Sequence, residues 1–164
     1  MWCRVVVWLA LGASLHAQGF ANADFEKGTA GAVPEGWFVP TAFAAYQATW
    51  VAEGCQQGKG CAEIAPGPNA GATPGNLMQM FDAAAYRGKQ IRYRAAVNVA
   101  PGARAGLWLR IDRPGGTMGF FDNMASRPIM TQGTWAIFRN RWIRARGGGE
   151  GRAGSIGVRR QSAL

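Results

Sequence analysis

The chain has 164 residues and a formal net charge of +9, with 18 lysines and arginines, 9 acidic residues and one histidine, His16. This length suffices for one domain with a substantial hydrophobic core. Residues 18–138 hold ten basic and eight acidic residues, whereas residues 139–164 hold seven arginines and one glutamate. Because most of the chain is nearly neutral, its overall charge does not by itself indicate a nucleic-acid-binding protein.

The first seventeen residues have the pattern of a secretion signal. Arg4 provides a positive charge, an apolar run follows over residues 5–11, and small residues lead to Ala17 as a cleavage position. The run is shorter than the roughly 20 residues of a membrane-spanning helix. We therefore expect a cleaved signal peptide over residues 1–17 and a secreted or periplasmic protein with no membrane span. A buried N-terminal strand is the alternative that Val-Val-Val permits.

Cleavage would leave a mature chain without histidine, because His16 and Cys3 both precede the cleavage position. Ser-His-Asp catalysis, Cys-His catalysis and histidine-based metal sites each need an imidazole, so all three would be excluded. Cys55 and Cys61 enclose a polar loop with two glycines, and an exported protein meets an oxidising compartment. We predict a disulfide between them. A metal pair would lack two further ligands, and a redox pair usually has the spacing Cys-x-x-Cys.

Residues 18–138 form the predicted domain and contain no convincing amphipathic helix. Strands are predicted over residues 43–51, 61–65, 77–81, 90–99, 106–112 and 119–121, with a proline- and glycine-rich loop over residues 66–74. In the segment 106–112, Leu107, Leu109 and Ile111 alternate with Trp108, Arg110 and Asp112, so the two sets occupy opposite faces. Strands at this spacing without crossover helices predict an all-β fold, an antiparallel two-sheet β-sandwich of the jelly-roll type.

The segment 139–164 loses this alternation and contains Gly147-Gly148-Gly149 among its arginines. One interpretation is a basic, irregular or disordered tail that contacts nucleic acid or another anionic surface. The other is a shift of reading frame near Ile137, because GC-rich genes read out of frame become rich in Arg, Gly and Ala. Codons for Arg139-Asn140-Arg141, shifted by one base, can spell Glu-Ile-Val. We favour the frameshift and expect a β-like continuation in another frame.

Two sets of motifs carry a resemblance to known modules. Asn22-Ala23-Asp24-Phe25-Glu26, followed by Pro34-Glu35-Gly36-Trp37, resembles the first strand and turn of galactose-binding-like β-sandwich modules, which include many carbohydrate-binding modules. The ordered motifs from Tyr86 to Trp135 are similar to accessory sandwich domains of bacterial exported or regulatory proteins. The resemblance covers residues 20–137 and implies a non-catalytic binding module normally attached to a catalytic or regulatory domain. Such domains continue past the tryptophan with an alternating strand, from which this sequence departs.

Aromatic side chains are candidate carbohydrate contacts, because ring faces pack on the C–H groups of sugars. The candidates are Trp37, Tyr46, Trp50, Trp108 and Trp135. On its strand Trp108 shares a face with Arg110 and Asp112, which combines a stacking surface, a forked donor and an acceptor. The predicted ligand-binding set is therefore Trp37, Trp108, Arg110, Asp112, Asp122 and Asn123. Core packing, ion pairs at the rim and turn capping are the structural alternatives.

No catalytic residue and no cofactor is predicted. A structural calcium ion would use oxygen ligands near the first strand, with Asp24 and Glu26 as candidates, but no acidic loop supports it. One alternative function is a small glycoside-active enzyme that uses two carboxylates, Asp112 and Asp122. The other is a binder of nucleic acid or anionic surfaces that loses binding when residues 139–164 are deleted. We expect binding rather than catalysis, because small modules with scattered acids and no evident cleft usually bind.

Overall fold

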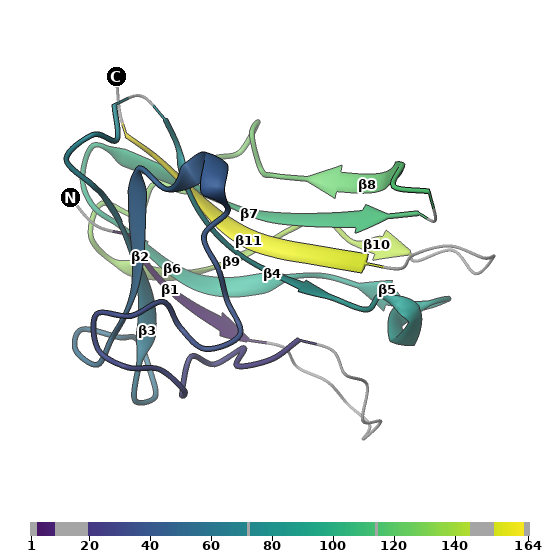
Figure 1. The fold of residues 1–164 in the computed structure, drawn as a ribbon, viewed down its shortest axis with the longest axis horizontal. Coiled ribbons are helices and arrows are strands. Elements are labelled where there is room, and N and C mark those ends of the chain that lie inside the picture. Colours follow the sequence, from purple (N-terminus) through teal and green to yellow (C-terminus); the bar gives the residue numbers. More distant parts are fainter. Residues whose placement is uncertain (1–2, 9–19, 72, 114, 145–152, 163–164) are drawn as a thin grey trace.

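The computed structural model describes residues 3–8, 20–71, 73–113, 115–144 and 153–162 of the chain. Its two larger sheets pack against each other, and every pairing of named strands is antiparallel (Figure 1). The all-β sandwich that the sequence predicts is therefore confirmed. Two short 3-10 helices, η1 (Thr41–Phe43) and η2 (Ala84–Tyr86), are described. None of the helices in the described ranges has the length and apolar character needed to span a bilayer.

The larger sheet has five strands and the opposing sheet has four. In spatial order the first contains β2 (Tyr46–Val51), β3 (Cys61–Pro66), β1 (Cys3–Trp8), β6 (Arg94–Val99) and β9 (Trp135–Arg139). The second contains β4 (Gly75–Phe81), β11 (Ala153–Ser162), β7 (Ala103–Asp112) and β8 (Met118–Asp122). A small third sheet pairs β5 (Gln90–Ile91) with β10 (Ile143–Arg144). The predicted strand 90–99 is thus interrupted at residues 92–93, because its two parts pair with different partners.

The core lies between the two larger sheets. Leu107 and Leu109 of β7 are buried against the same apolar cluster as Val97 and Val99 of β6 and Ile64 of β3. Fully burying an aliphatic side chain of this size contributes about 1.5–3 kcal/mol, so these alternating positions provide much of the driving force for the fold. The predicted alternation of segment 106–112, with its odd- and even-numbered residues on opposite faces, is consistent with this burial, and the structure turns the odd-numbered set toward the core.

The N-terminal segment lies inside the five-stranded sheet. β1 runs between β3 and β6, with Cys3 opposite Ile64 and Val99, and the Cys3 side chain is fully buried. Arg4 Nε donates to Glu63 Oε2 at 3.2 Å. The structure thus places residues 3–8, which belong to the predicted signal peptide, in a strand inside the sheet, which matches the strand alternative in its secondary structure. Cleavage of residues 1–17 stays a prediction, and it would remove the strand that joins β3 to β6.

The C-terminal segment also differs from its expected irregular form. Residues 153–162 form β11, which lies between β4 and β7 (yellow in Figure 1). In this register Val158 lies opposite Leu77 of β4 and Leu107 of β7. Two flanking strands supply hydrogen bonds along β11, which compensates for the poor strand propensity of Gly154 and Gly157. The triple glycine lies outside the described residues, and the frameshift stays a prediction.

The predicted disulfide is present. Cys55 and Cys61 are bonded, with their Cα atoms 5.6 Å apart. The bridge belongs to a second apolar cluster that contains Cys61, Ala96 and the partly buried Trp135. Trp135 also donates from Nε1 to the Gly54 carbonyl oxygen at 3.2 Å. The disulfide loop is therefore held against the five-stranded sheet at two points.

Candidate functional site

The solvent-facing side of the four-stranded sheet, called the outer face below, carries the centre of the predicted ligand-binding set. Arg110 of β7 lies opposite Phe121 of β8 on one side and Ser155 of β11 on the other. Ser155 in turn lies opposite Met80 of β4. Cross-strand partners share a face, so these four positions form one row across the sheet. Phe121 is 45% exposed and Met80 is 55% exposed, which makes this row accessible to a ligand.

Trp108 belongs to the outer face but is largely covered by its neighbours. Its indole Nε1 donates to Asn76 Oδ1 on β4 at 2.9 Å, across the intervening β11. Gly157 is the β11 residue opposite Trp108, and a glycine leaves room for a ring to cross that strand. Trp108 is only 7% exposed, whereas Phe121 is 45% exposed. The two rings are in edge-to-face contact, with their centroids 6.2 Å apart. The exposed ring on this face is therefore Phe121, held in place by Trp108.

Arg110 and Asp112 supply polar groups beside this ring. Arg110 Nε donates to Asp112 Oδ1 at 2.7 Å, and their side chains are 43% and 20% exposed. The sequence predicted that they contact a ligand, with ion pairs at the rim as the structural alternative; in the structure they pair with each other. A partly exposed pair contributes little to stability. The other N–H groups of the guanidinium fork can still reach a polar ligand on this face.

Asp122 is occupied by the protein itself. Both of its carboxylate oxygens accept hydrogen bonds from Arg127, and one also accepts from Asn140 Nδ2 and the Arg141 N–H, each at 3.1 Å. Burial alone would raise the pKa of Asp122, but these hydrogen bonds and one from the Met124 N–H hold it well below its usual range. Asp122 lies opposite the core-facing Leu109 and so occupies the other side of the sheet from Asp112.

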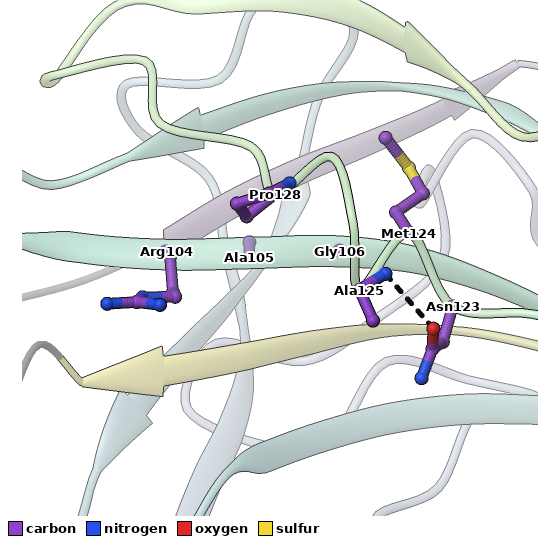
Figure 2. Close-up of a pocket in the computed structure, with 7 residues that line it drawn as sticks. All are labelled: Arg104, Ala105, Gly106, Asn123, Met124, Ala125 and Pro128. Carbon is purple, nitrogen blue, oxygen red and sulfur yellow. Dashed lines mark hydrogen bonds between the residues drawn. The ribbon is translucent and has the colours of Figure 1, made fainter.

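Asn123 caps a turn next to a small pocket. Its Oδ1 accepts a hydrogen bond from the Ala125 N–H at 3.0 Å, which matches the turn-capping alternative. Figure 2 shows this bond at one side of the pocket, while the Arg104 side chain extends toward the other side. The pocket holds about 100 Å³ and is lined by Arg104, Ala105, Gly106, Asn123, Met124, Ala125 and Pro128. Sites for organic ligands usually hold roughly 300–1,000 Å³, so this pocket is too small for a sugar subsite.

The remaining predicted aromatic candidates belong to the interior or its margins. Trp37 is 6% exposed and packs between Phe20 and Phe25, with ring centroids 5.4 Å and 5.0 Å away. Tyr46 is buried. Trp50 is partly buried and donates from Nε1 to the Phe25 carbonyl oxygen at 2.7 Å. The structure therefore separates Trp37 from Trp108, Arg110 and Asp112, which do share a face.

Asp24 and Glu26 do not converge on a common point. Asp24 Oδ1 accepts from the Glu26 N–H at 3.4 Å, whereas Glu26 Oε1 accepts from the Lys59 N–H at 2.8 Å. Across the part of the chain that the structure describes, no three His, Cys, Asp or Glu residues gather into a metal-binding group. This geometry therefore does not support a calcium ion at Asp24 and Glu26.

Sequence reasoning missed Phe121 and Met80 as members of the outer face. The Phe120-Phe121 pair was included in a short predicted strand, but neither residue could be assigned to a face. Phe120 lies opposite the partly buried Ile111 and packs on the core, which turns Phe121 outward. Met80 joins the row only through the pairing of β11 with both β4 and β7. No signal within residues 75–81 indicates that neighbour.

Comparison with known proteins adds information on the fold. No protein-family model matches the sequence, and no curated protein matches it. The enzymatically active domain of bacteriophage CBA120 tailspike protein 4 is similar in structure, with a TM-score of 0.50 and 12% identity over 79% of this chain and 18% of that chain. A carbohydrate-binding module of the β-sandwich superfamily has a TM-score of 0.48 and 12% identity over 90% of this chain and 56% of that one.

The chain thus spans less than a fifth of the tailspike chain and little more than half of the module chain. At 12% identity the tailspike likeness is evidence for the sandwich fold alone. One fold can host unrelated functions, so the chemistry of this chain depends on its own residues.

Proposed function

We propose that this chain is a non-catalytic, exported carbohydrate-binding module that holds its ligand on the outer face of the four-stranded sheet. The observation that supports this most is the exposed Phe121 ring, which lies one cross-strand position from Arg110 and its partner Asp112. A ring face and a forked donor with a neighbouring acceptor suit the alternating C–H and hydroxyl groups of a sugar. The proposed role is to keep an attached or neighbouring catalytic domain close to a polysaccharide.

The shape of the outer face favours a chain-like glycan over a small molecule. Met80, Arg110 and Phe121 lie in one row across the sheet, and the pocket near Asn123 is too small for a sugar ring. An open row of this kind contacts several units of an extended ligand without enclosing any one of them. This is a reason to test polysaccharides before monosaccharides.

The carboxylate arrangement argues against the alternative of a two-carboxylate glycosidase. Such enzymes need two carboxyl groups flanking one glycosidic bond, one of them protonated at working pH. Asp112 and Asp122 lie on opposite sides of the sheet, and hydrogen bonds from Arg127 and its neighbours hold the pKa of Asp122 low. Asp122 is therefore ionised at neutral pH. It has neither the protonation state of a general acid nor a position on the same face as Asp112.

Affinity electrophoresis on a panel of neutral polysaccharides tests the proposal directly. The full chain is expected to be retarded by at least one of them and to release no reducing sugar from it. Phe121→Ala removes the exposed ring and should weaken binding about tenfold, comparable to the loss of an aromatic stacking contact. Trp142→Ala removes a similarly exposed ring elsewhere and serves as the matched control.

The expected control result is unchanged retardation for Trp142→Ala. Equal losses for both variants would show that the outer face is not the site. Reducing-sugar release that persists in purified protein would favour the enzyme, and the absence of retardation across the panel would remove the glycan assignment.

A further inference from the structure

Two basic segments from distant parts of the chain lie side by side at β5 and β10. Ile91 pairs with Ile143, the Asn140 N–H donates to the Tyr93 carbonyl oxygen at 2.9 Å, and Arg94 pairs with Arg139. Neither of the two segments, residues 87–94 and residues 139–144, contains an acidic residue. The paired segments 87–94 and 139–144 contain six cationic residues with described side chains, called the basic strip below: Arg87, Lys89, Arg92, Arg94, Arg139 and Arg141.

The strip contains a like-charge pair that stability alone does not explain. Arg94 and Arg139 are directly opposite each other on β6 and β9, an arrangement that is destabilising for two cations. The Nε atom of Arg94 is buried and has no hydrogen-bond acceptor, which adds a further cost. A bound anion beside both guanidinium groups would offset both costs.

No described carboxylate neutralises the strip. Among the described residues, none of the six cations forms an ion pair with an acid, and the ion pairs found involve Arg4, Arg110 and Arg127 instead. Asp122 touches the strip only through the Arg141 N–H and is already paired with Arg127. Burial raises the pKa of Tyr93, so its phenol stays protonated and adds no negative charge.

An exposed tryptophan completes the strip. Trp142 is 58% exposed, and the Arg92 guanidinium carbon lies 4.2 Å from its ring centroid. The contact orders the ring and places a cation against it. The Trp142 ring can pack on a saturated ring of a ligand. The Arg92 guanidinium and the opposite pair of Arg94 and Arg139 can bind its carboxylates.

We propose that the basic strip is a second binding site, which takes an acidic polysaccharide with carboxylate groups, such as a uronate polymer. Five of the six cations are arginines, whose planar fork binds a carboxylate through two hydrogen bonds, whereas lysine acts as a point charge. Single-stranded nucleic acid is less well matched, because its binding sites usually offer several aromatic rings for successive bases. The strip shares no residue with the outer face, so the proposal does not depend on the neutral-glycan site.

Titration of the full chain with four probes tests the site: polygalacturonate, dextran sulfate, neutral dextran and a single-stranded oligo-dT. Polygalacturonate is expected to bind most tightly, and its affinity should fall about tenfold between 50 and 300 mM NaCl as its charges are screened. Arg94→Gln combined with Arg139→Gln should weaken that binding at least tenfold. Trp142→Ala should weaken it severalfold.

Two controls separate a specific site from general charge. Lys27→Gln combined with Arg104→Gln removes the same charge at exposed positions outside the strip and should change the affinity by less than twofold. Met130→Ala removes an exposed apolar side chain that belongs to neither proposed site and should leave polygalacturonate binding intact. Because Arg94→Gln with Arg139→Gln removes a like-charge pair, its thermal midpoint should stay the same or rise, so that lost binding does not reflect unfolding.

Three outcomes would overturn the proposal. An equal loss for the Lys27 and Arg104 variant would show that only net charge matters. Dextran sulfate that binds as tightly as polygalacturonate would remove the carboxylate assignment. Oligo-dT that binds at least tenfold more tightly would make the strip a nucleic-acid site.

Discussion

Asp122 connects three parts of the chain that are separate in sequence. Its carboxylate accepts hydrogen bonds from Arg127 in the loop after β8 and from the Asn140 side chain and the Arg141 N–H after β9. The same Asn140 amide also donates to the Leu107 carbonyl oxygen on β7 at 3.2 Å. One ionised side chain therefore determines how the loop and the basic strip attach to the four-stranded sheet.

We expect Asp122→Asn to lower the free energy of unfolding by about 2 kcal/mol at pH 7, because it leaves Arg127 without its counter-charge. The pKa of Asp122 is lower in the folded state than the ordinary value of about 3.9, so stabilisation is complete above that value and is lost as pH falls below it. The difference between the two proteins should therefore shrink between pH 5 and pH 2. Urea unfolding at several pH values measures it.

Asp82→Asn is the matched control, because Asp82 accepts from the Ala84 N–H at 2.8 Å at an exposed position. Its effect should stay below about 1 kcal/mol. A difference for Asp122→Asn that is constant from pH 7 to pH 2 would contradict the assigned ionisation.

At the scale of the elements, β1 is the strand whose retention matters most. It pairs with β3 on one side and with β6 on the other, and no other described strand joins those two. Removing it would expose the hydrogen-bonding edges of two strands and part of the core around Cys3. Cleavage after Ala17 during export would therefore change the folded domain itself as well as its location.

A chain that begins at Gln18 is expected to lose more than about 3 kcal/mol of unfolding free energy relative to the full chain, because buried apolar contacts and two strand pairings disappear. Urea unfolding followed by tryptophan fluorescence measures the change. Arg4→Gln in the full chain is the control: it removes the ion pair with Glu63 but keeps the strand, and should cost about 1 kcal/mol or less. Equal midpoints for the full and shortened chains would show that β1 contributes nothing.

At the scale of the whole molecule, both large sheets depend on strands from the ends of the described chain. β1 lies inside one sheet and β11 inside the other, where it separates β4 from β7 (Figure 1). The pairings of β11 join residues that are far apart in sequence, such as Val158 with Leu77. Folds with such non-local pairing fold slowly, in milliseconds to seconds, because the chain must close long loops first.

Deletion of residues 153–164 is expected to abolish the cooperative thermal transition and to reduce the near-UV circular dichroism of packed aromatic rings. The reason is that β4 and β7 would lose their shared neighbour and Trp108 its support over Gly157. Differential scanning calorimetry and near-UV spectra measure both effects. An unchanged transition would instead match the irregular tail expected from the sequence.

Local patterns in the sequence determined much of this protein. Alternation over residues 106–112 and glycine- or proline-rich boundaries located most strands, because strand periodicity and turn chemistry are local properties. The spacing and setting of Cys55 and Cys61 were enough to predict their disulfide. The shared face of Trp108, Arg110 and Asp112 followed from the same two-residue period.

Only the tertiary structure decided which strands became neighbours. Phe121 became the exposed ring because β8 pairs with β7 in one register, and Arg94 came opposite Arg139 because β6 pairs with β9. Likewise, pairing on both sides gave β1 and β11 interior positions that their own residues do not specify. These outcomes depend on contacts between residues distant in sequence, and a local period carries no information about which partner a strand will meet.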